Sequence, residues 1–180
     1  MKPIGPLMRE HRLIERMVKQ LEAELGRINA SQRCEPSFID IAVDFFRIYA
    51  DRTHHGKKED ILFAALAKKR LAEEHRETME GLIADHVFAR KTVVRVVAAK
   101  EKYVSGSTAS LADITECITE LVKLYPRHIE KEDKHFFYPS MEYFNRREQD
   151  EMLDRFWEYD QGMIHQKYQQ VLADLEEGRA

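Results

Sequence analysis

The sequence contains the stretch HGKKEDILF at residues 55–63 and a similar stretch, HIEKEDKHF, at residues 128–136. Both place a glutamate four residues after a histidine, which pairs His55 with Glu59 and His128 with Glu132. In an α-helix, residues i and i+4 lie one above the other on the same face. Each pair can therefore present an imidazole nitrogen and a carboxylate oxygen to the same small region of a helical core.

The rest of the chain also has helical periodicity. The 180 residues include only 7 Gly and 5 Pro, which favours long uninterrupted helices over many short strands. Four interruptions, at residues 26–36, 68–74, 105–108 and 139–145, separate five helical segments. Because short connections join antiparallel neighbours, we predict an all-α, up-down antiparallel four-helix bundle over residues 1–141. Residues 142–180 are predicted to add a fifth, C-terminal helix packed on the bundle.

Apolar residues recur at spacings of three and four along the first four segments, and one level of each stripe is polar. With a rise of about 1.5 Å per residue, antiparallel packing brings these polar levels to one layer of the core. In chain order, the polar residues are His11, His55 with Glu59, His86, and His128 with Glu132.

Such a layer is best explained by a metal site. Buried carboxylates are very costly unless cations neutralise them. Ligation by imidazole and carboxylate suits iron, and also manganese or zinc, whereas the lack of thiolates argues against a structural zinc site. The alternative is that the histidines are ordinary core residues and that the glutamates pair with Arg52 or a lysine. For one histidine alone this alternative is favoured, but six groups in one duplicated pattern favour metal binding.

Four stretches of the sequence resemble the hemerythrin-like (HHE cation-binding) family. They are MREHRLIERM around His11, ADRTHHGKKEDILF around His55, LIADHVFARK around His86 and YPRHIEKEDKHFFYP around His128. The resemblance covers about residues 1–141 and implies a left-handed four-helix bundle with a non-haem centre of two iron ions. It further implies an oxo or hydroxo bridge between the ions, the four histidines as terminal ligands, and Glu59 and Glu132 as bridging ligands.

The chain departs from the oxygen-carrying members of that family. They have a second histidine one turn before the third-helix ligand, and here that position is Leu82. Their fourth helix ends in a longer-spaced aspartate, whereas this chain has a second HxxxE pair. The set of four histidines and two glutamates is more similar to bacterial iron-centre repair proteins and eukaryotic iron-sensing proteins. Reversible oxygen carriage is accordingly less well supported.

Four further histidines are not part of this set. His165, in the fifth helix, is a candidate to replace the ligand missing at Leu82, or else to form a hydrogen bond with a tyrosine at the helix seam. His54 points about 100° away from His55 on an ideal helix, so we expect it to be exposed or outside the ligand set. His135 lacks a matching second ExxH motif, and His75 is expected to be solvated.

The predicted centre leaves open coordination positions, which distinguish a reactive site from a structural one. One hypothesis is a redox or iron-handling protein that reacts with O₂, NO or peroxide, in stress defence or iron-centre repair and with a redox partner. The other is an O₂- or NO-binding or iron-sensing module without turnover, so the sequence leaves enzyme activity open. Iron storage would need a hollow assembly that the sequence does not indicate, and a purely structural bundle is the remaining alternative.

The composition argues against other classes of protein, namely nucleic-acid-binding and membrane-spanning proteins. The net charge of −3 gives no basic surplus for nucleic-acid binding. No stretch approaches the roughly 18 apolar residues of a membrane span, and the start lacks an apolar leader segment. Cys34 and Cys117 share no CxxC spacing, so a reducing cytoplasmic location is expected. The sequence does not predict the oligomeric state.

Overall fold

The computed structural model describes residues 2–160 and 162–177, and all regular secondary structure in these residues is helical. The predicted all-α class is confirmed. In chain order the elements are α1 (Ile4–Ser31), α2 (Pro36–Asp44), η1 (Phe45–His55), η2 (Lys58–Phe63), α3 (Ala64–Leu66), α4 (Glu73–Val104), α5 (Ser110–Glu130), η3 (Lys131–Phe136), α6 (Phe137–Ser140), η4 (Met141–Tyr143), α7 (Arg146–Tyr159) and α8 (Gly162–Glu176).

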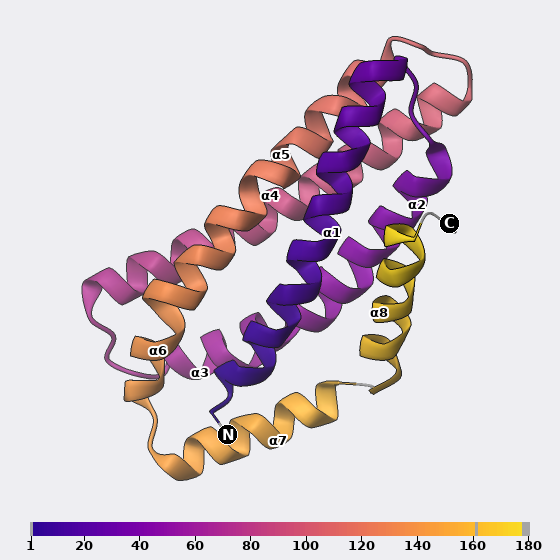
Figure 1. The fold of residues 1–180 in the computed structure, drawn as a ribbon. Helices are drawn as coiled ribbons and strands as arrows, with labels where there is room; N and C mark the ends of the chain where they lie inside the picture. Colours follow the sequence, from indigo (N-terminus) through magenta and orange to yellow (C-terminus); the bar gives the residue numbers. More distant parts are fainter. Residues whose placement is uncertain (1, 161, 178–180) are drawn as a thin grey trace.

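Four long helical runs form the body of the molecule (Figure 1). They are α1, the run from α2 to α3, α4, and the run from α5 to α6. Helix α5 packs against both α4 and α1, and α2 packs against α4. This arrangement is consistent with a hemerythrin-like helical bundle, and the up-down order of four helices stays a prediction.

The first helix is longer than the sequence pattern predicted. We expected an interruption from Gly26, but α1 continues to Ser31. It ends at Gln32, whose φ of 55° places it in the left-handed region and whose N–H donates to the Ile28 carbonyl. A single helical glycine costs only about 1 kcal/mol relative to alanine, which the packing of the surrounding helix outweighs.

Three stretches of the bundle are wound as π-helix, namely η1, η2 and η3. In this geometry each N–H bonds to the carbonyl five residues earlier, so a turn holds more residues than an α-helical turn. At the end of η1, the Gly56 N–H donates to the Asp51 carbonyl in this way, and the Thr53 hydroxyl donates to the Ile48 carbonyl. The π-helical stretches contain the buried polar residues His54, His55, Lys58 and Glu132.

The C-terminal segment forms two helices in place of the predicted single fifth helix. Helix α7 ends at Tyr159, and Asp160 has an extended conformation with ψ of 102°. The Asp160 carboxylate accepts hydrogen bonds from Lys57 and His165, which draws the chain toward the bundle and explains the break. Helix α8 packs on α1 and η1, while α7 packs on η2. Tyr159, at the end of α7, lies against Gly56, where an added Cβ would collide with the tyrosine ring unless that ring shifted. The division at residue 141 stays a prediction.

The apolar core is divided into two clusters, and the polar layer lies between them. On α1, Leu7 belongs to one cluster and Ile14 to the other, with His11 between them. On α4, His86 similarly follows Leu82 of the first cluster. The polar side chains are therefore enclosed by apolar packing on both sides along the helices.

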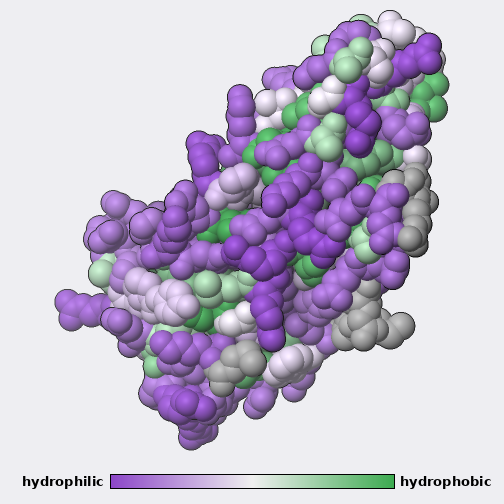
Figure 2. All heavy atoms as spheres, in the orientation of Figure 1, coloured by the Kyte–Doolittle hydropathy of each residue, from purple (hydrophilic) through white to green (hydrophobic). Residues whose placement is uncertain are grey.

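The surface shown in Figure 2 is predominantly hydrophilic, with scattered apolar side chains between the charged ones. Within the described residues, none of the helices combines the length and the apolar character that crossing a bilayer requires.

Candidate metal centre

Six buried side chains of the polar layer form two groups of three. Within each group the potential ligand atoms all lie within 4.8 Å of one another. One group consists of histidines only, and the second combines two histidines with one carboxylate. The two groups are His55, His86 and His128, and His11, His54 and Glu132. We call them the three-histidine group and the Glu132 group.

Each of the five histidines has a carboxylate at its Nδ1 atom. The distances from Nδ1 to a carboxylate oxygen are 2.7 Å for His11 and Asp133, 2.7 Å for His54 and Glu10, 3.3 Å for His55 and Asp51, 2.6 Å for His86 and Glu59, and 3.1 Å for His128 and Asp85. A neutral histidine that donates through Nδ1 carries a lone pair on Nε2. Outer carboxylates of this kind are typical of histidines that bind metals through the other ring nitrogen.

Not every Nε2 atom of these histidines has the hydrogen-bond partner that a buried position requires. The Nε2 atoms of His86 and His128 lie 3.2 Å apart, so two lone pairs face one another when both rings donate through Nδ1. The Nε2 atom of His54 has no hydrogen-bond partner, alone among the buried side-chain nitrogen and oxygen atoms of the described residues. A cation that accepts these lone pairs would satisfy them, so the residues present fit a metal ion.

Burial keeps three of these histidines neutral, as metal ligation requires. Removal from water, together with the nearby Lys58 ammonium, lowers the pKa of His54 well below its ordinary value. Burial likewise lowers the pKa of His86, and it lowers the pKa of His55 to about 3. Their ring nitrogens are therefore available as electron-pair donors at neutral pH.

Glu132 is the one carboxylate of the two groups. Its side chain is fully buried and accepts hydrogen bonds from the Lys58 Nζ atom at 2.7 and 2.8 Å and from His11 Nε2 at 3.0 Å. Burial alone would raise the pKa of Glu132, but the Lys58 ammonium and the adjacent His128 lower it well below its usual range. Burial lowers the pKa of Lys58, and the Glu132 carboxylate opposes that change.

The structure brings together five of the six residues that the sequence pattern selected, and Glu59 is the exception. Its carboxylate is 26% exposed and accepts hydrogen bonds from His86 Nδ1 and from Arg90 Nη2 at 2.7 Å. It thus lies across the His86 ring from the Nε2 atom. The observed contact between Glu59 and His86 Nδ1 orients the His86 ring. The role of Glu59 as a bridging ligand stays a prediction.

His54 and Lys58 are the central residues that the sequence analysis missed. Of the two alternatives expected for His54, exposure was wrong, because its side chain is 1% exposed and lies in the Glu132 group. The reason is the π-helical winding of η1, which turns both His54 and His55 inward. Whether His54 is a ligand or lies outside the ligand set stays a prediction. The sequence carried a signal, since Lys58 stands four residues after His54 just as Glu59 stands four residues after His55.

His165 lies outside both groups. It forms a third cluster with Glu10 and Asp160, in which its Nδ1 atom lies 3.0 Å from the Tyr49 hydroxyl and its Nε2 atom 3.1 Å from an Asp160 oxygen. The Lys57 ammonium already pairs with the carboxylates of Glu10 and Asp160. This cluster supports His54 through Glu10, and a ligand role for His165 stays a prediction.

The two remaining histidines lie away from the centre. His135 is exposed, as its lack of a partner motif suggested. His75 is half-buried rather than solvated, and its Nδ1 atom lies 2.7 Å from the Tyr143 hydroxyl.

Comparison with known proteins agrees with this geometry. Residues 2–139 match the family model of the hemerythrin HHE cation binding domain. The chain belongs to this family. The resemblance predicted from the sequence is thereby confirmed, and the family assignment together with the two ligand groups supports a cation-binding role. No curated protein and no solved structure matches the chain.

A cavity of about 260 Å³ reaches the three-histidine group at His55. Its walls are mostly apolar. The charged side chains among them are Arg47, Asp51 and Arg90, and the last two are joined by a 2.7 Å hydrogen bond. The lining residues are Phe46, Arg47, Asp51, His55, Ala89, Arg90, Val93, Val94 and Tyr125. In this member of the HHE family, the cavity connects the centre to the surface beside Val94, which is 61% exposed.

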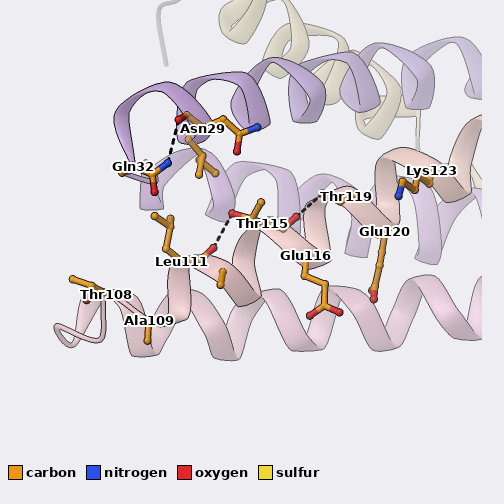
Figure 3. A pocket seen from close by; sticks show the side chains of 12 residues that line it. Asn29, Gln32, Thr108, Ala109, Leu111, Thr115, Glu116, Thr119, Glu120 and Lys123 are labelled. Carbon is orange, nitrogen blue, oxygen red and sulfur yellow. Dashed lines mark hydrogen bonds between the residues drawn. The ribbon is translucent and has the colours of Figure 1, made fainter.

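A larger groove of about 790 Å³ lies elsewhere, between the end of α1 and the first half of α5 (Figure 3). It is lined by residues such as Gln32, Thr115 and Glu120, and none of its lining residues is a histidine. The groove is therefore not part of the metal centre.

We predict that His54 is needed for metal binding. His54→Ala should weaken Fe(II) binding, measured by anaerobic dialysis and metal analysis, by about 100-fold or more. Losing a ligand should cost at least as much as losing an outer carboxylate, which costs about 10- to 100-fold. His135→Ala is the matched control and should bind Fe(II) as the wild type does. An unchanged affinity in a folded His54→Ala variant would contradict the assignment.

Proposed function

We propose that the chain is a non-haem iron protein whose centre has two cation positions and reacts with O₂, NO or peroxide. The observation that carries this proposal is the pairing of two ligand groups, each with three potential ligand atoms within 4.8 Å of one another, one of which, His54 Nε2, has no hydrogen-bond partner. Two groups of three protein ligands would leave open coordination positions, as reactive metal sites require.

The donor set favours iron, with manganese and zinc as substitutes. Imidazole with carboxylate suits all three metals, and a thiolate would favour zinc. Cys34 and Cys117, both free and buried, belong to neither ligand group. Two free thiols also agree with the proposed cytoplasmic location, where thiols stay reduced.

Bound iron would supply electron transfer and a coordination position for the incoming molecule. The residues of the chain orient and protect that position. Outer carboxylates such as Asp85 and Asp133 fix the histidine rings, which removes the entropy cost of aligning them during binding. The apolar clusters on both sides of the layer exclude water, and the cavity at His55 admits small molecules.

The cavity favours small uncharged reactants. Phe46, Val93 and Tyr125 line it with apolar surface, and of its three charged side chains Asp51 and Arg90 pair with each other while Arg47 is exposed to solvent. A neutral diatomic or peroxide molecule loses little hydration on entering such walls, whereas an ion would lose much more. Nitrosative or oxidative stress defence and iron-centre repair, with an external redox partner, are the roles that fit these reactants.

Stopped-flow absorption spectroscopy tests the proposed reactivity. Protein loaded anaerobically with Fe(II) should be oxidised on mixing with O₂ or peroxide, or should consume NO, with repeated turnover when a reductant is present. His128→Ala, which lacks a ligand of the three-histidine group, should show no such reaction. A stable and reversible spectrum without oxidation would instead indicate a binding or sensing module. No reaction with any of the three molecules would contradict the proposal.

The cavity predicts a second effect on rate. Val94→Trp should narrow the mouth of the cavity and slow the reaction with O₂ several-fold while the iron content stays the same. Val104→Trp is a matched control, because Val104 also lies on α4, is 63% exposed and does not line the cavity. Equal rates in the two variants would show that reactants enter by another route.

A further inference from the structure

Lys58 lies at the junction of the two ligand groups. Its side chain is fully buried, and its Nζ atom donates hydrogen bonds of 2.7 and 2.8 Å to the two carboxylate oxygens of Glu132. The same Nζ atom lies 3.2 Å from the Nε2 atom of His128. The ammonium thus contacts one member of each group, through the atoms that a metal ion would use.

The charges of the centre do not favour two metal ions together with the Lys58 ammonium, because few carboxylates are available to neutralise them. Glu132 is the one carboxylate in the two groups, and Lys58 already neutralises it. The outer carboxylates lie across the imidazole rings, and each of them already accepts a hydrogen bond from a histidine. Two metal ions beside a buried ammonium would therefore repel it strongly in a medium of low dielectric constant.

We infer that the Lys58 ammonium occupies one of the two cation positions, so that the protein takes up its metal ions in two unequal steps. The first ion binds the three-histidine group, where Lys58 contacts only His128. The second ion needs Glu132, and because Lys58 Nζ donates to both of its carboxylate oxygens, Lys58 must first withdraw from them. This inference rests on the proposed function and makes Lys58 the residue that separates the affinities of the two metal ions.

The neighbouring Lys57 provides a matched comparison. It is equally buried, but its Nζ atom pairs with Glu10 and Asp160 and does not contact any of the six ligand residues. Replacing either lysine therefore removes a buried ammonium, whereas only the replacement of Lys58 removes the cation that pairs with Glu132.

Anaerobic equilibrium dialysis against Fe(II) tests the inference. Wild-type protein should bind one ion tightly and a second about 100-fold more weakly or worse, the factor that follows from breaking a buried ion pair. In Lys58→Met, which fills similar space without charge, the two affinities should differ by less than about tenfold, because Glu132 is then free. Lys57→Met should keep the wild-type separation of the two steps.

A second variant of Lys58 keeps the test valid if Lys58→Met does not fold. Lys58→Gln keeps a hydrogen-bond donor for Glu132 without the charge, and it should also bring the two affinities together. Two equal steps in the wild type, or an unchanged separation in both Lys58 variants, would overturn the inference while leaving the proposed function intact. Wild-type protein that binds no Fe(II) would instead overturn the proposed function itself.

Discussion

The buried ion pair between Lys58 and Glu132 is the interaction on which the polar layer depends. Both side chains are fully buried, and each is the main charged partner of the other. Removing one member of such a pair typically costs about 3–5 kcal/mol, because an uncompensated charge is left in the core. The pair therefore allows a charged centre to exist inside a helical bundle before any metal ion binds.

Around this pair, the histidines are positioned by contacts on their outer side. Carboxylates at Nδ1 hold each ring, so that Nε2 faces the centre. These contacts are costly by themselves, since His54 Nε2 has no partner and two other Nε2 atoms face each other at 3.2 Å. A bound metal ion would remove this cost, so metal binding and folding stability should be linked.

Much of the centre could be predicted from the sequence. The helical spacing of apolar residues placed His86 and Glu132 in one layer, because each polar residue interrupts an otherwise apolar stripe. The spacing could not give the inward positions of His54 and Lys58, or the outer position of Glu59. Those follow from π-helical winding, which changes the number of residues per turn, so that the His54–Lys58 spacing could not be placed on an ideal α-helix. The break at Asp160 depends on partners far away in the sequence and was missed for that reason.

The central claim is that inward-facing histidine Nε2 atoms bind the metal ion. X-ray absorption spectroscopy of protein loaded anaerobically with Fe(II) tests it most directly, because imidazole rings give a characteristic multiple-scattering pattern. The account predicts several imidazole ligands per bound iron. An iron environment of oxygen atoms alone, without imidazole scattering, would contradict it.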